Sequence, residues 1–197
     1  MKRWNWWVAL CVCCLLTGCY NANESRENVL KVYNWADYIG EGVLEDFQEY
    51  YNRGYRGILF DIDNTLVPHG APEDERVIKL FKHLKEIGFK TCLISNNKEY
   101  RVKPFADKLG TKYIYDAHKP SKKSYTKAFD VLETDKDETM FVGDQIFTDV
   151  FGANRVNMYT ILVKPIHPKE EIQIVLKRYL EKIVLWTYRR ELRKSNK

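Results

Sequence analysis

From Arg56 onwards the chain alternates short apolar runs with segments of helical periodicity, and this alternation limits the folds open to it. The apolar runs are typical of buried parallel strands, and they are Gly57–Phe60, Thr91–Ile94, Tyr113–Tyr115, Met140–Val142 and Tyr159–Val163. Helices are predicted between them, at Val77–Ile87, Glu99–Leu109, Ser121–Leu132 and Phe147–Asn154. Strands that alternate with helices favour an α/β fold with an open, doubly wound parallel sheet of the Rossmann-like kind.

Polar side chains follow four successive strands of this predicted sheet. In chain order they are Asp61, Asp63, Ser95, Asn96, Lys119, Asp144 and Asp149. In a doubly wound sheet, ligands bind beyond the carboxyl ends of the strands, so these side chains are expected to meet there. Carboxylates this close together repel each other unless a cation offsets them. Oxygen ligands without His or Cys favour Mg²⁺.

The pattern therefore predicts a magnesium-dependent phosphoryl-transfer site. One of Asp61 and Asp63 can attack phosphorus in line while the other protonates the leaving oxygen, then activates water against the aspartyl-phosphate. Ser95 and Lys119 would hold the transferred oxygens and offset their charge. Taken singly, each residue could instead be an acid that caps a helix or a solvated lysine; the ordered set favours the site.

Four motifs in order resemble the haloacid dehalogenase (HAD) superfamily over residues 54–166: DIDNT, ISN, HKP and GDQIFTD. The resemblance implies that Asp61 is the nucleophile and a metal ligand. It also implies that Asp63 is the acid/base and binds the metal through its backbone carbonyl, and that Asp144 is the remaining protein ligand, supported by Asp149.

The same resemblance implies supporting roles for two more residues. Thr65 would stabilise the turn of the first motif, and the Asn96 backbone would lie near the phosphate beside Ser95 and Lys119. Members of this superfamily often carry a cap domain over the site. The segments between Asp61, Ser95 and Lys119 are too short for one, so an open site is expected.

Further stretches, among them GYRGILFDIDNTLVPHGAP and LEKIVLW, resemble the YqeG branch of HAD subfamily IIIA. That branch is related to phosphatidylglycerophosphate phosphatases. The resemblance implies hydrolysis of this lipid to phosphatidylglycerol and phosphate, with an anionic lipid head group as the bound partner. A soluble phosphomonoester remains the alternative substrate.

The first residues resemble a bacterial lipoprotein signal. A basic start and a short apolar run lead to Leu16-Thr17-Gly18-Cys19, which predicts a signal peptide at 1–18 and lipidation of Cys19. This N-terminus predicts a membrane-anchored lipoprotein. If this N-terminus is instead an artefact that joins two genes, a cytoplasmic, membrane-peripheral protein is expected.

Residues 19–53 are predicted to form a polar spacer, a short strand at Leu30–Tyr33 and a helix from Glu41 to Tyr51. This segment resembles the mature N-terminus of polyamine-binding lipoproteins, so a lipid-anchored polyamine-binding transport component is the alternative function from another class. One strand and one helix cannot enclose a polyamine, and no polyamine ligand is expected.

Residues 167–197 are predicted to form an amphipathic helix and a basic tail. Its apolar stripe is expected to pack on the sheet and comprises Ile172, Val175, Leu176, Tyr179, Leu180 and Ile183. Beyond it, Trp186 and Tyr188 adjoin several arginines, which suits either an anionic membrane surface or a solvated end. The net charge is +5, but no nucleic-acid-binding module accompanies it, so no nucleic acid is expected.

Overall fold

The computed structural model describes residues 31–33, 41–167 and 172–195. The predicted signal peptide and the predicted lipidation site at Cys19 lie outside these residues, as does most of the predicted spacer.

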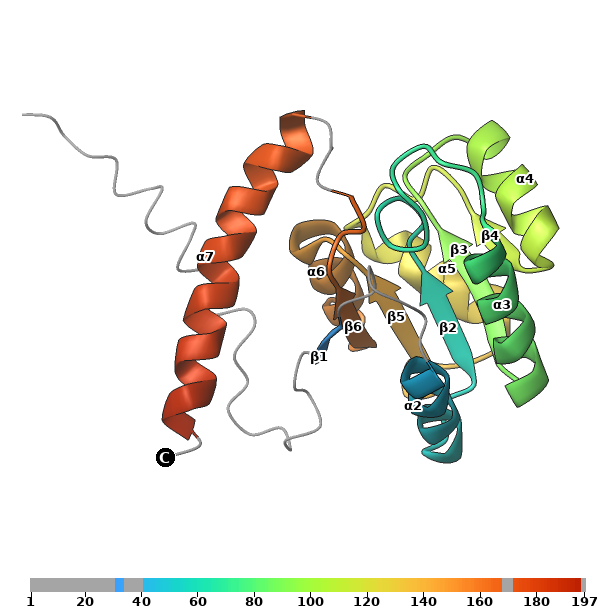
Figure 1. The fold of residues 1–197 in the computed structure, drawn as a ribbon, viewed down its shortest axis with the longest axis horizontal. Coiled ribbons are helices and arrows are strands. Elements are labelled where there is room, and N and C mark those ends of the chain that lie inside the picture. Colours follow the sequence, from blue (N-terminus) through green and yellow to red (C-terminus); the bar gives the residue numbers. More distant parts are fainter. Residues whose placement is uncertain (1–30, 34–40, 168–171, 196–197) are drawn as a thin grey trace, which may run out of the picture.

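Six parallel strands form one sheet in the order β1-β6-β5-β2-β3-β4 (Figure 1). They are β1 (Lys31–Tyr33), β2 (Gly57–Phe60), β3 (Lys90–Ile94), β4 (Lys112–Ile114), β5 (Thr139–Gly143) and β6 (Tyr159–Val163). Strand β2 lies between β3 and β5, with Phe60 paired to Leu93 on one side and Val142 on the other. The strand order reverses at β2, which confirms the doubly wound sheet. In such sheets, ligands bind beyond the strand ends at the point of reversal.

Helices cover both faces of the sheet. They are α2 (Glu41–Asn52), α3 (Glu75–Ile87), α4 (Glu99–Leu109), α5 (Lys122–Leu132) and α6 (Phe151–Asn154). The last helix, α7 (Ile172–Ser195), lies to the side of the sheet (Figure 1). Helix α3 begins where the Asp74 side chain accepts a hydrogen bond from the Val77 amide. It ends at Gly88, whose φ of 110° is in the region that favours glycine.

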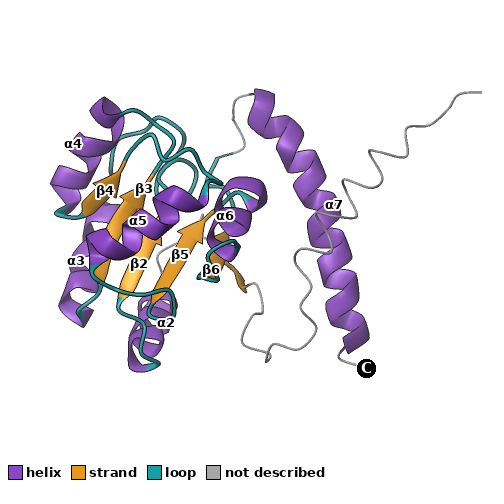
Figure 2. Cartoon of the chain, turned by 180° about the vertical axis from the view of Figure 1, so that it is seen from behind, coloured by secondary structure: helices purple, strands orange, loops and turns teal. Residues whose placement is uncertain are grey.

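Alternate side chains of β2 enter two hydrophobic clusters, one on each face. Ile58 and Phe60 pack with side chains of α2, α3 and α4, whereas Leu59 packs with side chains of α5 and α6. Figure 2 shows α5 and α6 on the face opposite α3. Because both faces are buried, β2 is apolar throughout.

The N-terminal segment is part of this fold. Strand β1 pairs in parallel with β6 at the edge of the sheet, and α2 contributes Phe47 and Tyr50 to the core. The hydroxyl groups of Tyr50 and Tyr159 are 3.1 Å apart. The predicted strand and helix therefore exist, and they extend the sheet and core.

The predicted helix at Phe147–Asn154 begins as a single π-helical turn, Ile146–Val150, and only then continues as α6. The Val150 amide donates to the Gln145 carbonyl oxygen at 3.2 Å, a bond that spans five residues. Such turns often occur at functional sites. This one carries Asp149, whose side chain is buried.

Helix α7 leaves part of its predicted apolar stripe exposed. Of the stripe residues whose side chains are described, Tyr179, Leu180 and Ile183 are 65%, 55% and 60% exposed, so the expected packing on the sheet is wrong for them. A helical period predicts which residues share a face but not what that face meets. Among the helices of the described residues, none is both long and apolar enough to cross a membrane.

Candidate active site

Asp61 lies directly after β2, where its amide donates to the Val142 carbonyl oxygen at 2.9 Å. Its carboxylate pairs with Lys119 from the loop after β4, with Nζ 2.5 Å from Oδ1. The same Nζ lies 2.7 Å from Asp149 Oδ1. The structure therefore brings together residues of the first, third and fourth motifs.

Three buried carboxylates form the centre of the site. Asp61, Asp144 and Asp149 each offer an oxygen, and these oxygens all lie within 4.8 Å of one another. The Thr65 hydroxyl bridges two of them, 3.3 Å from Asp61 Oδ2 and 3.2 Å from Asp144 Oδ1. The Gln145 amide donates to Asp149 Oδ2 at 3.0 Å, which fixes that carboxylate against the π-helical turn.

The electrostatics of the cluster reflect this crowding. Burial raises the pKa of Asp61 to about 6; Lys119 opposes the shift, and Asp149 and Asp63 add to it. Burial, with Asp61 and Asp149 nearby, raises the pKa of Asp144 well above its ordinary value. Burial by itself would lower the pKa of Lys119, but the carboxylates of Asp149 and Asp61 outweigh it and raise that pKa. The lysine therefore stays charged.

The side chain of Asp63 lies apart from the three carboxylates. Asn97 Nδ2 donates to its Oδ2 at 2.5 Å, the Gly70 amide donates to its Oδ1 at 2.7 Å, and Arg101 Nη2 lies 3.3 Å from Oδ1. These contacts orient its side chain independently of the cluster. Sequence reasoning missed Asn97 and Arg101, because only the fold brings the loop after β3 and helix α4 to Asp63.

Ser95 and Asn96 lie at the end of β3, as predicted, but they make different contacts. Ser95 is buried, and its Oγ accepts a hydrogen bond from the Asn97 amide at 3.1 Å. The Asn96 side chain accepts a hydrogen bond from the Lys119 amide at 2.6 Å. Asn96 therefore positions the loop that carries Lys119.

Helix α7 supplies two residues that sequence reasoning also missed. Arg178 pairs with Asp144 Oδ2 and donates to the Asp144 carbonyl oxygen at 2.6 Å. Glu181 is 5% exposed, accepts from the Ile146 amide at 2.7 Å and pairs with Arg178 at 2.9 Å. Burial raises the pKa of Glu181. The one available signal was a pair of opposite charges three residues apart, on the helix face opposite the apolar stripe.

The donor set fits a hard divalent cation. Asp61, Asp144 and Asp149 supply carboxylate oxygens, which Mg²⁺ prefers. Lys119 and Arg178 offset only part of the negative charge that three ionised carboxylates would carry, so a cation bound there would favour their ionised forms. Among the residues that the structure describes, no other group of acidic, histidine or cysteine side chains meets the same geometric criterion.

Residues 73–157 match the family model for haloacid dehalogenase-like hydrolases. With the relatives below, this match shows that the chain belongs to that family, as a phosphatase on an uncapped fold. Within the family it is similar to "Probable phosphatase YqeG" of Bacillus subtilis, with 39% identity over 140 residues, 71% of this chain and 81% of the relative.

Two more distant similarities were found. "Phosphatidylglycerophosphate phosphatase 1, chloroplastic/mitochondrial" of Arabidopsis thaliana is 25% identical over 162 residues, or 77% of this chain but only 46% of that protein. A HAD phosphatase crystal structure from Thermococcus onnurineus superposes with a TM-score of 0.49 at 14% identity, over 59% of this chain and 89% of that one.

Proposed function

We propose that this phosphatase is magnesium-dependent and hydrolyses phosphatidylglycerophosphate through a phosphorylated Asp61. The observation that carries the chemistry is the buried group of Asp61, Asp144 and Asp149, with Lys119 paired to two of them. Asp63 lies two residues from Asp61 and is oriented separately from it. A nucleophile and a proton carrier are thus available at one strand end.

In the first half-reaction a carboxylate oxygen of Asp61 bonds to phosphorus, and the bond from phosphorus to the glycerol oxygen breaks. Protonated Asp63 donates its proton to that oxygen, which leaves as the hydroxyl of phosphatidylglycerol. Lys119 keeps the Asp61 carboxylate oriented through its 2.5 Å contact.

In the second half-reaction Asp63, now a carboxylate, accepts a proton from water. The water oxygen bonds to phosphorus, the bond from phosphorus to Asp61 breaks, and phosphate leaves. Bound at the carboxylate cluster, Mg²⁺ would neutralise charge on the transferred phosphoryl oxygens. Asp61 and Asp144 would hold it through their side chains and Asp63 through its backbone carbonyl, with Asp149 alongside.

Two observations support a lipid as the substrate. One named relative is a phosphatidylglycerophosphate phosphatase. In addition, the segment from Asp63 to β3 holds one helix, and the segment from β3 to Lys119 holds one helix and one strand, so no cap domain lies within them to limit substrate size. A soluble phosphomonoester is the second candidate, since the same chemistry serves both.

The test measures phosphate release by the full chain from phosphatidylglycerophosphate in mixed micelles, with and without Mg²⁺. Glycerol 3-phosphate and an aryl phosphate serve as soluble substrates. Asp61→Asn is the catalytic variant, and Asp130→Asn, at an exposed carboxylate on α5, is the matched control.

We expect magnesium-dependent release from the lipid, lowered at least about a thousandfold by Asp61→Asn and unchanged by Asp130→Asn. Release from soluble substrates only would keep the mechanism and reject the lipid. Full activity after exhaustive chelation of metal would reject the magnesium requirement.

A further inference from the structure

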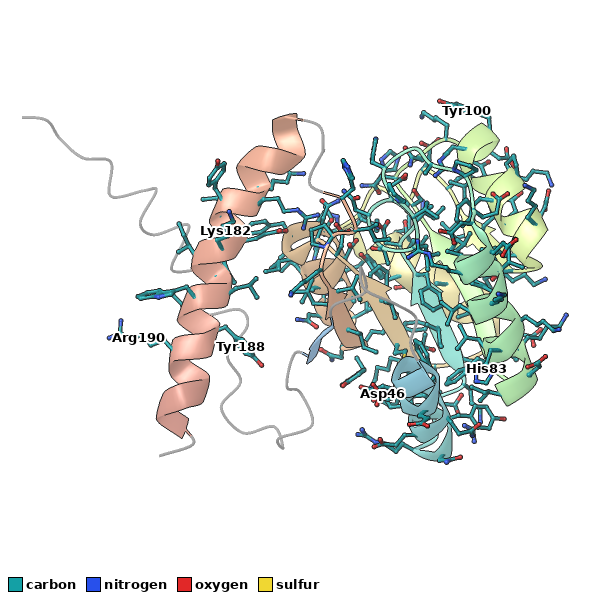
Figure 3. The ribbon with its side chains drawn as sticks, viewed as in Figure 1. Asp46, His83, Tyr100, Lys182, Tyr188 and Arg190 are labelled. Atoms are coloured by element: carbon teal, nitrogen blue, oxygen red, sulfur yellow. The ribbon has the colours of Figure 1, made fainter. Side chains whose placement is uncertain are left out.

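Helix α7 presents two chemically different faces. Its inner face carries Arg178 and Glu181, which bind Asp144 and the Ile146 amide at the catalytic edge. Val184, Leu185 and Tyr188 continue this face and are partly buried. Figure 3 shows Tyr188 on the side of α7 toward the sheet and Arg190 on the side away from it.

The opposite side, here called the outer face, consists of Tyr179, Leu180, Ile183 and Trp186. Their exposed fractions are 65%, 55%, 60% and 61%. These four are the majority of the seven exposed large hydrophobic side chains among the described residues, and they lie within eight positions of one helix. Spacings of three and four residues place Tyr179, Ile183 and Trp186 in one row. Such a concentrated apolar surface marks an interaction site.

Cations border the outer face. Lys182 lies over the Tyr179 ring at 5.2 Å, and Arg190 lies over the Trp186 ring at 5.6 Å. The sequence of α7 contains seven Lys/Arg and two Glu, a net charge of +5. The entire chain also has a net charge of +5, so the remainder is close to neutral and the positive charge resides on this helix.

We propose that the outer face of α7 lies in the head-group region of an anionic lipid bilayer. Aromatic and aliphatic side chains would enter the boundary with the acyl chains, while Lys182 and Arg190 would reach the lipid phosphates. The positive charge of α7 favours an anionic bilayer over a second copy of the chain as the partner of the outer face. Pairing two outer faces would bring two helices of charge +5 together.

This surface and the active site are connected through one helical turn. Arg178, which contacts Asp144, is followed directly by Tyr179 and Leu180 of the outer face. Bilayer contact would therefore occur within one turn of the catalytic carboxylates. The inference rests on exposure and charge and does not depend on the proposed reaction.

The experiment follows the fluorescence of Trp186 in the full chain, since the other four tryptophans all precede residue 36. Subtracting the emission of Trp186→Phe from that of the wild type isolates the Trp186 component. Spectra are recorded without substrate, with vesicles of phosphatidylglycerol and phosphatidylcholine, of phosphatidylcholine alone, and of brominated forms of both lipids. Because no substrate is present, a failure of Trp186 to respond to vesicles would not change the result of the phosphatase assay.

We expect the Trp186 component to shift to shorter wavelength and to be quenched by brominated lipid only when phosphatidylglycerol is present. Ile183→Glu should weaken this binding at least tenfold. Ile78→Glu, at an exposed isoleucine of α3, should leave it unchanged. Raising the salt concentration should weaken binding.

Three outcomes would overturn the proposal. In the first, the protein sediments with vesicles while the Trp186 component is unchanged, which assigns binding to the N-terminal apolar run. In the second, the component shifts with protein concentration in the absence of vesicles, which assigns the outer face to self-association. The third is binding by Ile183→Glu equal to that of the wild type.

Discussion

At the scale of single residues, the catalytic edge balances three buried carboxylates against two cations. Lys119 contacts Asp61 and Asp149, and Arg178 contacts Asp144, so each acid has a cationic neighbour. Burial still makes the charged form of Asp61 costly, which is why its pKa is raised to about 6. The site therefore holds charge that the fold does not fully compensate.

The variant Asp61→Asn tests the free-energy cost of burying the charged Asp61 carboxylate. The folded protein holds the Asp61 proton more tightly than the unfolded chain, so stability falls as pH rises from about 4 through about 6. In metal-free buffer the variant should be more stable than the wild type above pH 7, by up to about 3 kcal/mol, since one pKa unit corresponds to about 1.4 kcal/mol. The gain should vanish near pH 4.

Denaturant unfolding at several pH values measures this difference. The control, Asp130→Asn, should show no pH-dependent gain. A variant less stable than the wild type at pH 8 would mean that the Lys119 ion pair outweighs the cost of burying Asp61.

At the scale of elements, the junction of β5 with the π-helical turn shapes the site. The turn places Asp149 back against Gly143, the last residue of β5. A Cβ atom at Gly143 would lie 2.6 Å from Asp149 Oδ2 and 2.6 Å from the Phe141 ring. Only glycine leaves room for this close approach.

Gly143→Ala should therefore displace Asp149. We expect kcat to fall at least about tenfold and the free energy of unfolding to fall by about 1–3 kcal/mol, the usual cost of overpacking. Steady-state kinetics and denaturant unfolding measure the two effects. Thr139→Ala, at the other end of β5, should lower stability and leave kcat unchanged; equal kcat in both variants would contradict the close-approach argument.

At the scale of the whole molecule, α2 packs into one of the two hydrophobic clusters, the one that also contains Ile58 and Phe60 of β2. Phe47 of α2 is 3% exposed and meets Phe89 edge-on, with ring centroids 6.3 Å apart. Strand β1 adds to the sheet edge at β6. Folding of the catalytic part is thus expected to depend on residues that precede it.

Phe47→Ala should lower the free energy of unfolding by about 3 kcal/mol, as expected for truncating a buried aromatic side chain. Gln48→Ala, at an exposed neighbour on the same helix, should change it by less than about 0.5 kcal/mol. One cooperative unfolding transition in both variants is the expected behaviour. Loss of α2 in a separate, earlier transition would show that it folds apart from the core.

The sequence by itself determined the strands, the helices and the order of the residues at the candidate site. Buried parallel strands are short continuous apolar runs, and residues that follow them must meet at one sheet edge, so Asp61, Lys119 and Asp144 could be grouped without a structure. The predicted boundaries of β4 and of the helix after β5 differ from those observed, because pairing and the π-helical turn set them.

Only the tertiary structure decided what each surface meets. Periodicity predicted an apolar stripe on the last helix, but Tyr179, Leu180 and Ile183 of that stripe are exposed. Arg178 and Glu181 of the opposite face reach the site instead. The sequence pattern likewise could not show that β1 pairs with β6 or that Arg101 contacts Asp63. Local sequence sets the conformation of an element through its own backbone and side chains, whereas the partner of each face depends on contacts between distant segments.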